Sequence, residues 1–209
     1  MMNGAVFGDK FSKDYKAIMN YARITPAAIK ENYIDIAGGN SSIDLTEAVG
    51  GVVFEDGTIE FMFTLIDFDK KESMKNDLHG KRMQIILERE ENFYYDGRVT
   101  CTKDEWINGH YELYFTAKVK PYKYEKRETI HIEKVNNTEK EIRLVNSRMP
   151  IMPEIKVEGN LYLTYENIRY HLTDGAYQIP EVTLYEGLNR IKVSGIGTIQ
   201  LTYRKGRLI

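Results

Sequence analysis

Apolar and polar residues alternate at every second position along much of this chain, and this constrains its fold more than any other feature. In the clearest segment Ile59, Phe61 and Phe63 fall on one side, and Glu60 and Thr64 fall on the other. Successive side chains of a β-strand point to opposite faces of a sheet, so this pattern predicts half-buried antiparallel strands. The segments with the strongest alternation are 58–68, 82–89 and 111–120.

One helix interrupts this pattern. Residues 69–79 place Met74 and Leu78 four positions apart, on one helical face, and Gly80 follows as a residue suited to a left-handed C-terminal position. Two apolar anchors cannot hold so short a helix in water, so we expect it to pack on a sheet. A second helical turn is predicted after Ser12, over 13–19.

After Pro121 the sequence pattern changes: short apolar runs are separated by turn residues such as Asn136-Asn137 and Asp174-Gly175. Short strands at a spacing of about ten residues are typical of a β-sandwich. We therefore predict a mainly β protein with two domains: a β-rich N-terminal domain with one short helix, residues 1–121, and a C-terminal β-sandwich, residues 122–209. The strands expected in the second domain are 129–135, 140–146, 154–158, 161–165, 168–172, 181–184, 189–194 and 198–204.

Composition and charge exclude several classes of function. The 209 residues include 29 Lys and Arg against 31 Asp and Glu, a net charge of −2, which does not indicate a nucleic-acid-binding protein. The single cysteine, Cys101, rules out an intrachain disulfide and favours assembly in a reducing cytoplasm. The N-terminus lacks the apolar core of a signal peptide, and no run approaches the ~20 apolar residues of a membrane span.

Motifs for metals and nucleotides are absent or incomplete. The four histidines, at 79, 110, 131 and 171, have no metal-ligand spacing. Asp67-x-Asp69 begins like a calcium loop but lacks the later ligands, so we interpret it as a strand end that runs into the helix. Gly195-Ile196-Gly197 is followed by a strand pattern instead of a helix, so we interpret it as a hairpin turn.

Candidates for catalysis have simpler structural interpretations. Cys101 has no evident base or cation beyond Lys103, and the carboxylates of 88–91 are explained by an exposed strand end. Trp106 could stack on a sugar with Tyr94, Tyr95 and Tyr111, but packing in the core or at an interface is favoured. We predict no enzyme activity and no catalytic, cofactor-binding or metal-binding residue.

The order of several segments resembles the distal tail proteins of long-tailed phages and prophages of Gram-positive hosts. The resemblance extends over nearly the whole chain, and it is the order and spacing of the segments together that make it specific. The segments that carry it are 32–47, 50–54, 59–65, 78–82, 94–99, 120–124, 174–180, 184–189 and 203–206, among them Asn32-Tyr33-Ile34-Asp35-Ile36-Ala37-Gly38-Gly39 and Lys120-Pro121-Tyr122-Lys123-Tyr124.

The resemblance implies a structural protein of the virion tail tip, assembled in the host cytoplasm. Distal tail proteins form a homohexameric ring that serves as the baseplate hub. The ring joins the tail tube protein to the tail-tip protein, of the tail-associated lysozyme type, and carries receptor-binding proteins. DNA passes through the ring without specific binding, and the C-terminal domain is a sandwich that resembles galectins or carbohydrate-binding modules. The resemblance implies no cofactor and no membrane partner.

Two expectations follow for such a ring. Residues 21–51 contain several apolar side chains but little periodicity, so we predict an arm that reaches along the adjacent subunit. The N-terminal domain has a net charge of −5, which favours an acidic channel wall that repels phosphates. The carboxylates that could contribute to this wall are Asp44, Glu47, Glu55, Asp56, Glu90 and Glu91.

The alternative function is a carbohydrate-binding module that contacts cell-wall glycans. It would require two or three tyrosines of the second domain to gather on an open face. The tyrosines in question are Tyr162, Tyr165, Tyr170, Tyr177 and Tyr185. A wall hydrolase, the third possibility, would need a matched carboxylate pair that the sequence does not indicate.

Overall fold

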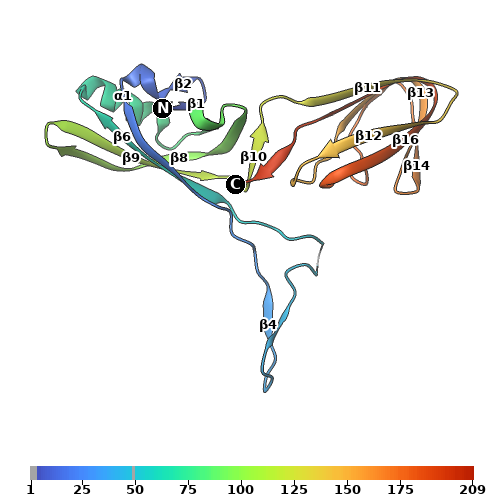
Figure 1. Cartoon of the computed structure of the whole chain (residues 1–209), viewed down its shortest axis with the longest axis horizontal. Coiled ribbons are helices and arrows are strands. Elements are labelled where there is room, and N and C mark those ends of the chain that lie inside the picture. The colour runs from blue at the N-terminus through green and yellow to red at the C-terminus, as the bar shows by residue number, and fades with distance from the viewer. Residues whose placement is uncertain (1–3, 49) are drawn as a thin grey trace. The chain divides into compact units, whose positions relative to one another are not determined.

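The computed structural model describes residues 4–48 and 50–209, and the chain divides into two compact units. One unit extends up to Lys123 and takes in Leu208–Ile209, and the other is Tyr124–Arg207. The described residues are mainly β-strand, as the alternation predicts (Figure 1). No helix among them is long and apolar enough to cross a membrane.

The first unit is built on a sheet in the order β2-β1-β7-β8-β9-β6-β3, with β10 pairing β8 and β17. β10 and β17 each have residues in both units. A separate two-stranded sheet joins β4 and β5. The elements are β1 (Ala5–Phe7), β2 (Lys10–Phe11), η1 (Ser12–Tyr15), β3 (Ile18–Thr25), β4 (Tyr33–Asp35), β5 (Ser42–Asp44), β6 (Gly57–Leu65), α1 (Phe68–Leu78), β7 (Arg82–Leu87), η2 (Glu88–Glu90), β8 (Phe93–Ile107), β9 (His110–Val119), β10 (Tyr122–Glu125) and β17 (Gly206–Leu208).

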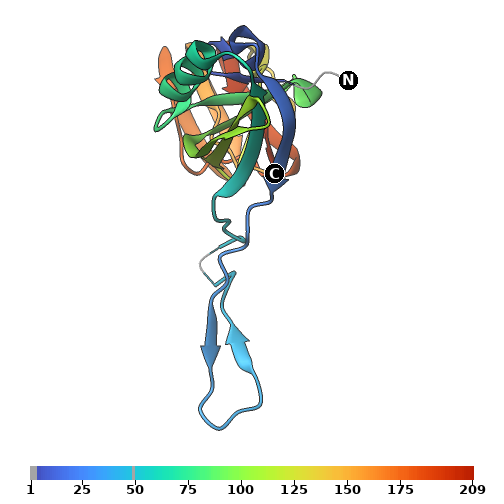
Figure 2. The ribbon, with the colours of Figure 1, turned by 90° about the vertical axis from the view of Figure 1, so that its left-hand side faces the viewer.

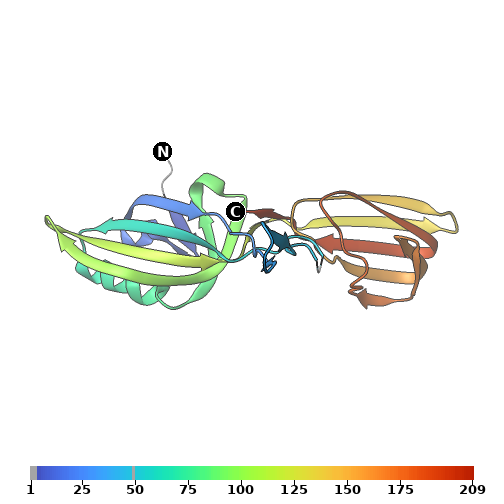
Figure 3. The same cartoon turned by 90° about the horizontal axis from the view of Figure 1, so that it is seen from below.

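The core of this unit lies between one face of the sheet and α1 (Figures 1 and 3). Met74 and Leu78 of α1 are fully buried, so both predicted anchors are confirmed. The buried sheet positions are every second residue, including Ile59, Phe61 and Phe63 of β6. The alternation therefore separates a core face from an opposite face that the helix does not cover.

Local signals explain where α1 begins and ends. The Asp67 carboxylate accepts the backbone N–H of Lys70 at 3.1 Å, which is an N-cap, so the acidic pair at 67 and 69 marks the start of a helix. Gly80 follows the helix with a φ of +77°, the left-handed conformation expected of it. The predicted turn after Ser12 is present as η1, but it ends at Tyr15 and β3 begins at Ile18.

The second unit contains a six-stranded sheet, of which two long strands form the centre. β16 pairs β11 along its C-terminal half, β12 along its N-terminal half and β13 along most of its length (Figure 1). Inward-facing residues of both halves form one core. The elements are β11 (Thr129–Asn136), β12 (Lys140–Asn146), β13 (Glu154–Tyr165), β14 (Ile168–Leu172), β15 (Gly175–Tyr177) and β16 (Gly187–Tyr203).

Three glycines form a crease where the sheet of this unit bends over its own core. Gly159 of β13 faces Gly197 of β16, and Gly195 faces Leu161, all at positions that continue the inward-facing series. All three glycines have positive φ angles, between +106° and +155°. A Cβ on Gly195 would lie 2.4 Å from the carbonyl oxygen of Asn160, so only glycine allows the two strands to cross this bend.

This crease corrects several predictions. Gly195-Ile196-Gly197 is a bend within β16 and not a hairpin turn, and the predicted strands 154–158 and 161–165 are one strand. The sequence pattern was ambiguous because glycine occurs at a bend within a continuing strand as readily as at a turn that reverses the chain. Residues 181–184 contribute only an isolated bridge between Ile151 and Leu184.

Substitution of a crease glycine should destabilise the fold through contact with the facing strand. We expect Gly195→Ala to lower the free energy of unfolding by about 2–3 kcal/mol, since it adds a backbone clash to the unfavourable φ. Gly187→Ala is the matched control, because Gly187 has a φ of +96° but nothing within 4 Å of its Cβ position. It should cost only about 1 kcal/mol. Urea unfolding followed by circular dichroism measures both, and equal losses would contradict the crease.

Candidate functional site: an exposed arm and a cationic hollow

Residues 28–48 and 50–56 form an arm that extends the β3–β6 hairpin beyond the sheet. Beyond the last β3–β6 pair, Thr25 with Thr58, an isolated bridge joins Ile29 to Phe54, and β4 then pairs β5. Backbone hydrogen bonds hold the two sides together: Lys30 N–H donates to Val53 O at 2.9 Å, and Glu55 N–H to Ala28 O at 2.8 Å. The stretch 21–51, predicted to be irregular, is therefore partly regular. Its start, up to Thr25, belongs to β3, and further along β4 and β5 pair as a two-stranded ribbon (Figures 1 and 2).

The arm lacks any covering from its own unit. Every residue from 28 to 44 is exposed. The ribbon has one apolar face, on which Ile34 and Ile43 pair directly and are each about half exposed. Isolated two-stranded ribbons are marginally stable in water, so this segment needs a partner surface.

The opposite face of the arm is acidic. Tyr33 pairs with Asp44. Asp35 lies two positions after Tyr33 on β4, and Glu31 lies two positions before it, just outside the strand. The pKa of Tyr33 is raised by the charge of Asp44 and then by that of Glu31. We call Glu31, Tyr33, Asp35 and Asp44 the acidic face. Residues 29–53 contain one lysine and four carboxylates, a net charge of −3.

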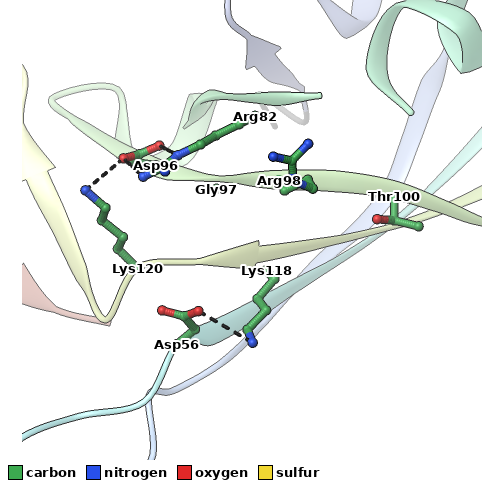
Figure 4. Close-up of a pocket in the computed structure, with 8 residues that line it drawn as sticks. All are labelled: Asp56, Arg82, Asp96, Gly97, Arg98, Thr100, Lys118 and Lys120. Atoms are coloured by element: carbon green, nitrogen blue, oxygen red, sulfur yellow. Dashed lines mark hydrogen bonds and ion pairs between the residues drawn. The ribbon is translucent and has the colours of Figure 1, made fainter. Parts of the chain in front are cut away.

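A cationic hollow of about 500 Å³ lies on the face of the first sheet that carries no helix (Figure 4). Four cations and two carboxylates line it, so its net charge is +2. Its lining residues are Asp56, Arg82, Asp96, Gly97, Arg98, Thr100, Lys118 and Lys120. The register of three strands forms it, because Arg82 faces Arg98 across β7–β8 and Arg98 faces Lys118 across β8–β9. We call Arg82, Arg98 and Lys118 the cationic row.

The two carboxylates of the hollow differ in how closely they contact its cations. Asp96 accepts two hydrogen bonds from Arg82, at 3.0 and 2.8 Å, and Lys120 Nζ lies 3.1 Å from it. The Arg82 hydrogen bonds hold the pKa of Asp96 below its usual value, with Lys120 adding to the effect against the opposing effect of burial. Asp56 is 3.6 Å from Lys118, and both side chains are exposed.

Arg98 is the least compensated of the cations. Its Nη1 donates to the carbonyl oxygen of Gly80 at 2.5 Å, and neither carboxylate of the hollow contacts it (Figure 4). Like charges that face each other across strands are destabilising. The row therefore has unused capacity to bind an anion.

The fold brings Cys101 and His79 together, which the sequence did not indicate. His79 Nδ1 accepts the backbone N–H of Cys101 at 2.9 Å. This ring nitrogen is therefore occupied by the backbone and does not act as a base for the Cys101 thiol. The Cys101 thiol donates to the carbonyl oxygen of Lys103 at 3.6 Å. Burial raises the pKa of the thiol, which disfavours the nucleophilic thiolate. This pair supports packing and not catalysis.

Two of the carboxylates of 88–91, those of Glu88 and Glu90, are engaged in structural contacts. Glu88 pairs with Lys13 at 2.6 Å, and Glu90 accepts from the Tyr95 hydroxyl and from Lys123, each at 2.7 Å. Glu90 is thus compensated, and it is a weak candidate for an acidic channel wall. Within residues 4–48 and 50–209 no group of three or more His, Cys, Asp or Glu could hold a metal ion.

A buried lysine that the sequence did not reveal ties α1 to β8. Lys71 is only 5% exposed, and its Nζ lies 2.6 Å from Glu72 and 3.0 Å from Asp104. The ammonium also lies about 5 Å from the ring centroids of Phe68 and Tyr111. The alternation pattern cannot identify such a residue, because its polar type suggests exposure.

The aromatic candidates are dispersed. Trp106 is 58% exposed and packs on Tyr111 with ring centroids 4.4 Å apart. It therefore lies outside the core, and packing at an interface, the other predicted alternative, stays a prediction. In the second unit Tyr165 is buried and its hydroxyl donates to Thr183 O, whereas the ring of Tyr162 is covered by the Arg169 guanidinium at 4.1 Å. Tyr170 and Tyr177 pack against the core of this unit, so of the five candidates only Tyr162 and Tyr185 are exposed. This arrangement does not favour the shared open face that a sugar site requires.

Removal of the Asp96 charge should destabilise the protein at neutral pH. A lowered folded-state pKa contributes stability above the usual value near 3.8, and this contribution is lost as the pH falls through the lowered pKa. We expect Asp96→Asn to reduce the free energy of unfolding by about 1 kcal/mol at pH 7. The difference should shrink as the pH falls below 3.8 and vanish once the pH is below the lowered pKa.

Urea unfolding of Asp96→Asn at several pH values measures this effect. Asp56→Asn is the control, and it should change little because its single pair with Lys118 is longer and exposed. A pH-independent loss in Asp96→Asn would mean that the charge of Asp96 does not hold the hollow together.

Comparisons with known proteins support the fold. No protein-family model and no curated protein matches the sequence. Among solved structures, the chain is similar to the SPP1 Dit (gp 19.1) protein, described as a paradigm of the hub adsorption apparatus in phages that infect Gram-positive bacteria. The TM-score is 0.73 at 13% identity, and the match covers 98% of this chain and 99% of the other. The resemblance to distal tail proteins is thus confirmed at the level of the fold: this chain has the fold of the SPP1 Dit protein over nearly its whole length.

Proposed function

We propose that this chain is a structural protein of a phage or prophage tail tip, where copies of it form a hub for the adsorption apparatus. The observation that carries the proposal is the extent of the match in fold, which includes both units and nearly all of each chain. A likeness in one unit alone would support only a common architecture. The dispersed candidates for catalysis give no support to an enzyme activity.

The proposed assembly is a closed homohexameric ring, the form that the resemblance implies. A ring requires two different contact surfaces on each copy, so that each copy binds the next through a heterologous interface. The arm is a suitable first surface, because residues 28–44 are all exposed and carry an apolar face. The number of residues in the arm is also close to the roughly 20–30 residues that each partner contributes to an interface of standard size.

The remaining parts of the proposal concern the partners of the ring. The tail tube protein, a tail-tip protein and receptor-binding proteins would bind it, with DNA passing through its centre. An acidic channel wall stays a prediction, with Glu47, Glu55 and Glu91 as its remaining candidates. Asp56 pairs with Lys118 in the cationic hollow, and Asp44 belongs to the acidic face of the arm. Lys and Arg along the channel would contradict it.

We expect the purified full-length chain to assemble, with six copies per particle. Replacing Tyr33–Asp44 by a short Gly/Ser turn should convert the assembly to monomers, because the deletion removes β4, β5 and the tip while leaving the β3–β6 pairs intact. This deletion removes both sides of the ribbon, whereas a deletion of 29–40 would remove only one. Sedimentation velocity and native mass spectrometry measure the particle mass.

Circular dichroism controls for folding of the shortened chain. A wild-type chain that stays monomeric at high concentration would contradict the proposed function. An unchanged assembly after the deletion would leave the hub role in place and remove the arm from it.

A further inference from the structure

We propose that the cationic row of one copy binds the acidic face of the arm of a second copy. This inference rests on the proposed function, because it names the surface that receives the arm in the self-assembly described above. It commits to a carboxylate-bearing protein segment as the occupant of the hollow.

The row carries more positive charge than its own chain neutralises. Arg82, Arg98 and Lys118 face one another on three adjacent strands, and all three are exposed. Asp96 is held by Arg82 and Lys120, which leaves Arg98 with a backbone carbonyl as its partner. A carboxylate placed between Arg98 and Lys118 would relieve the repulsion within the row.

The arm offers carboxylates at a compatible spacing. Adjacent strands lie about 4.8 Å apart, so the three cations extend over roughly 10 Å. Asp35 and Asp44 occupy diagonal positions on paired strands, about 7–8 Å apart, and Glu31 continues the series along β4's side of the ribbon. Long Arg and Lys side chains cover such differences in position.

The occupant must come from another copy. In the structure residues 28–44 of the arm are all exposed, and none of them lines the hollow of the same chain. The ribbon extends away from the sheet (Figures 1 and 2). The row and the acidic face are different surfaces of opposite charge on one chain, the condition for a heterologous contact that can close into a ring. The Ile34–Ile43 face would point away from the row, available to other parts of the assembly.

Duplex DNA is the main competing polyanion, and the hollow suits it less well. Asp56 and Asp96 lie among the four cations, so a continuous run of phosphates would meet two carboxylates. A discrete carboxylate can bind beside Arg98 without approaching Asp96, which Arg82 and Lys120 already hold.

Reversal and exchange of the charges test the contact in the full-length chain. Arg98→Glu with Lys118→Glu reverses the row, and Glu31→Lys with Asp35→Lys reverses the arm at two exposed positions. Each double variant should raise the concentration of half-assembly by about tenfold or more. The four substitutions together should return it to within about threefold of wild type, because they restore opposite charges in exchanged positions.

The control is Lys156→Glu with Lys192→Glu, two exposed lysines of the second unit whose reversal changes the net charge by the same amount as reversal of the row. This variant should assemble like wild type. Sedimentation velocity over a concentration series gives the half-assembly point, and circular dichroism verifies folding. Should the reversed row not fold, Arg98→Gln with Lys118→Gln removes the charge without reversing it, and it should weaken assembly to a lesser degree.

The outcomes separate this inference from the proposed function. Wild-type assembly that neither reversal weakens, or that the fourfold variant fails to restore, would overturn the arm-to-row contact and leave the hub role intact. A mobility shift of short duplex DNA that is lost only in the row variant, with assembly unchanged, would also overturn it. A wild-type chain without assembly would instead contradict the proposed function itself.

Discussion

A two-stranded β-ribbon buries too little apolar surface to hold its shape alone in water, and this constraint governs the interpretation of the whole chain. The arm of this protein is such a ribbon, with Ile34 and Ile43 exposed on one face and carboxylates on the other. Each unit, by contrast, has a complete core of its own. The protein therefore has two units with cores of their own and one exposed segment, the arm, for which we propose a partner.

The distribution of charge indicates how the arm would associate with a second copy. The arm is acidic, while the open face of its own sheet carries three cations in register. The two surfaces begin at the same place in the chain, because Asp56, at the base of the arm, also lines the hollow. Opposite charges on separate surfaces favour association between copies, and they select the orientation more strongly than they add affinity.

Much of the fold could be predicted from local pattern. The strands β6, β7 and β9, the anchors Met74 and Leu78, and the sandwich class all follow from periodicity and turn chemistry. The long strand β8 did not, because Gly97 and several charged residues interrupt its apolar series. Gly97 is required there, since a Cβ would lie 2.4 Å from the carbonyl oxygen of Lys118 on the neighbouring strand.

The sequence by itself determined which side of each strand is buried, because alternation is a property of neighbouring residues and needs no knowledge of distant ones. Only the tertiary structure decided which strands lie side by side. The row of Arg82, Arg98 and Lys118 exists because pairing aligns residues up to 36 positions apart, and the same is true of Cys101 beside His79. Register depends on long-range packing, so the site assembled by register could not be found from the pattern alone.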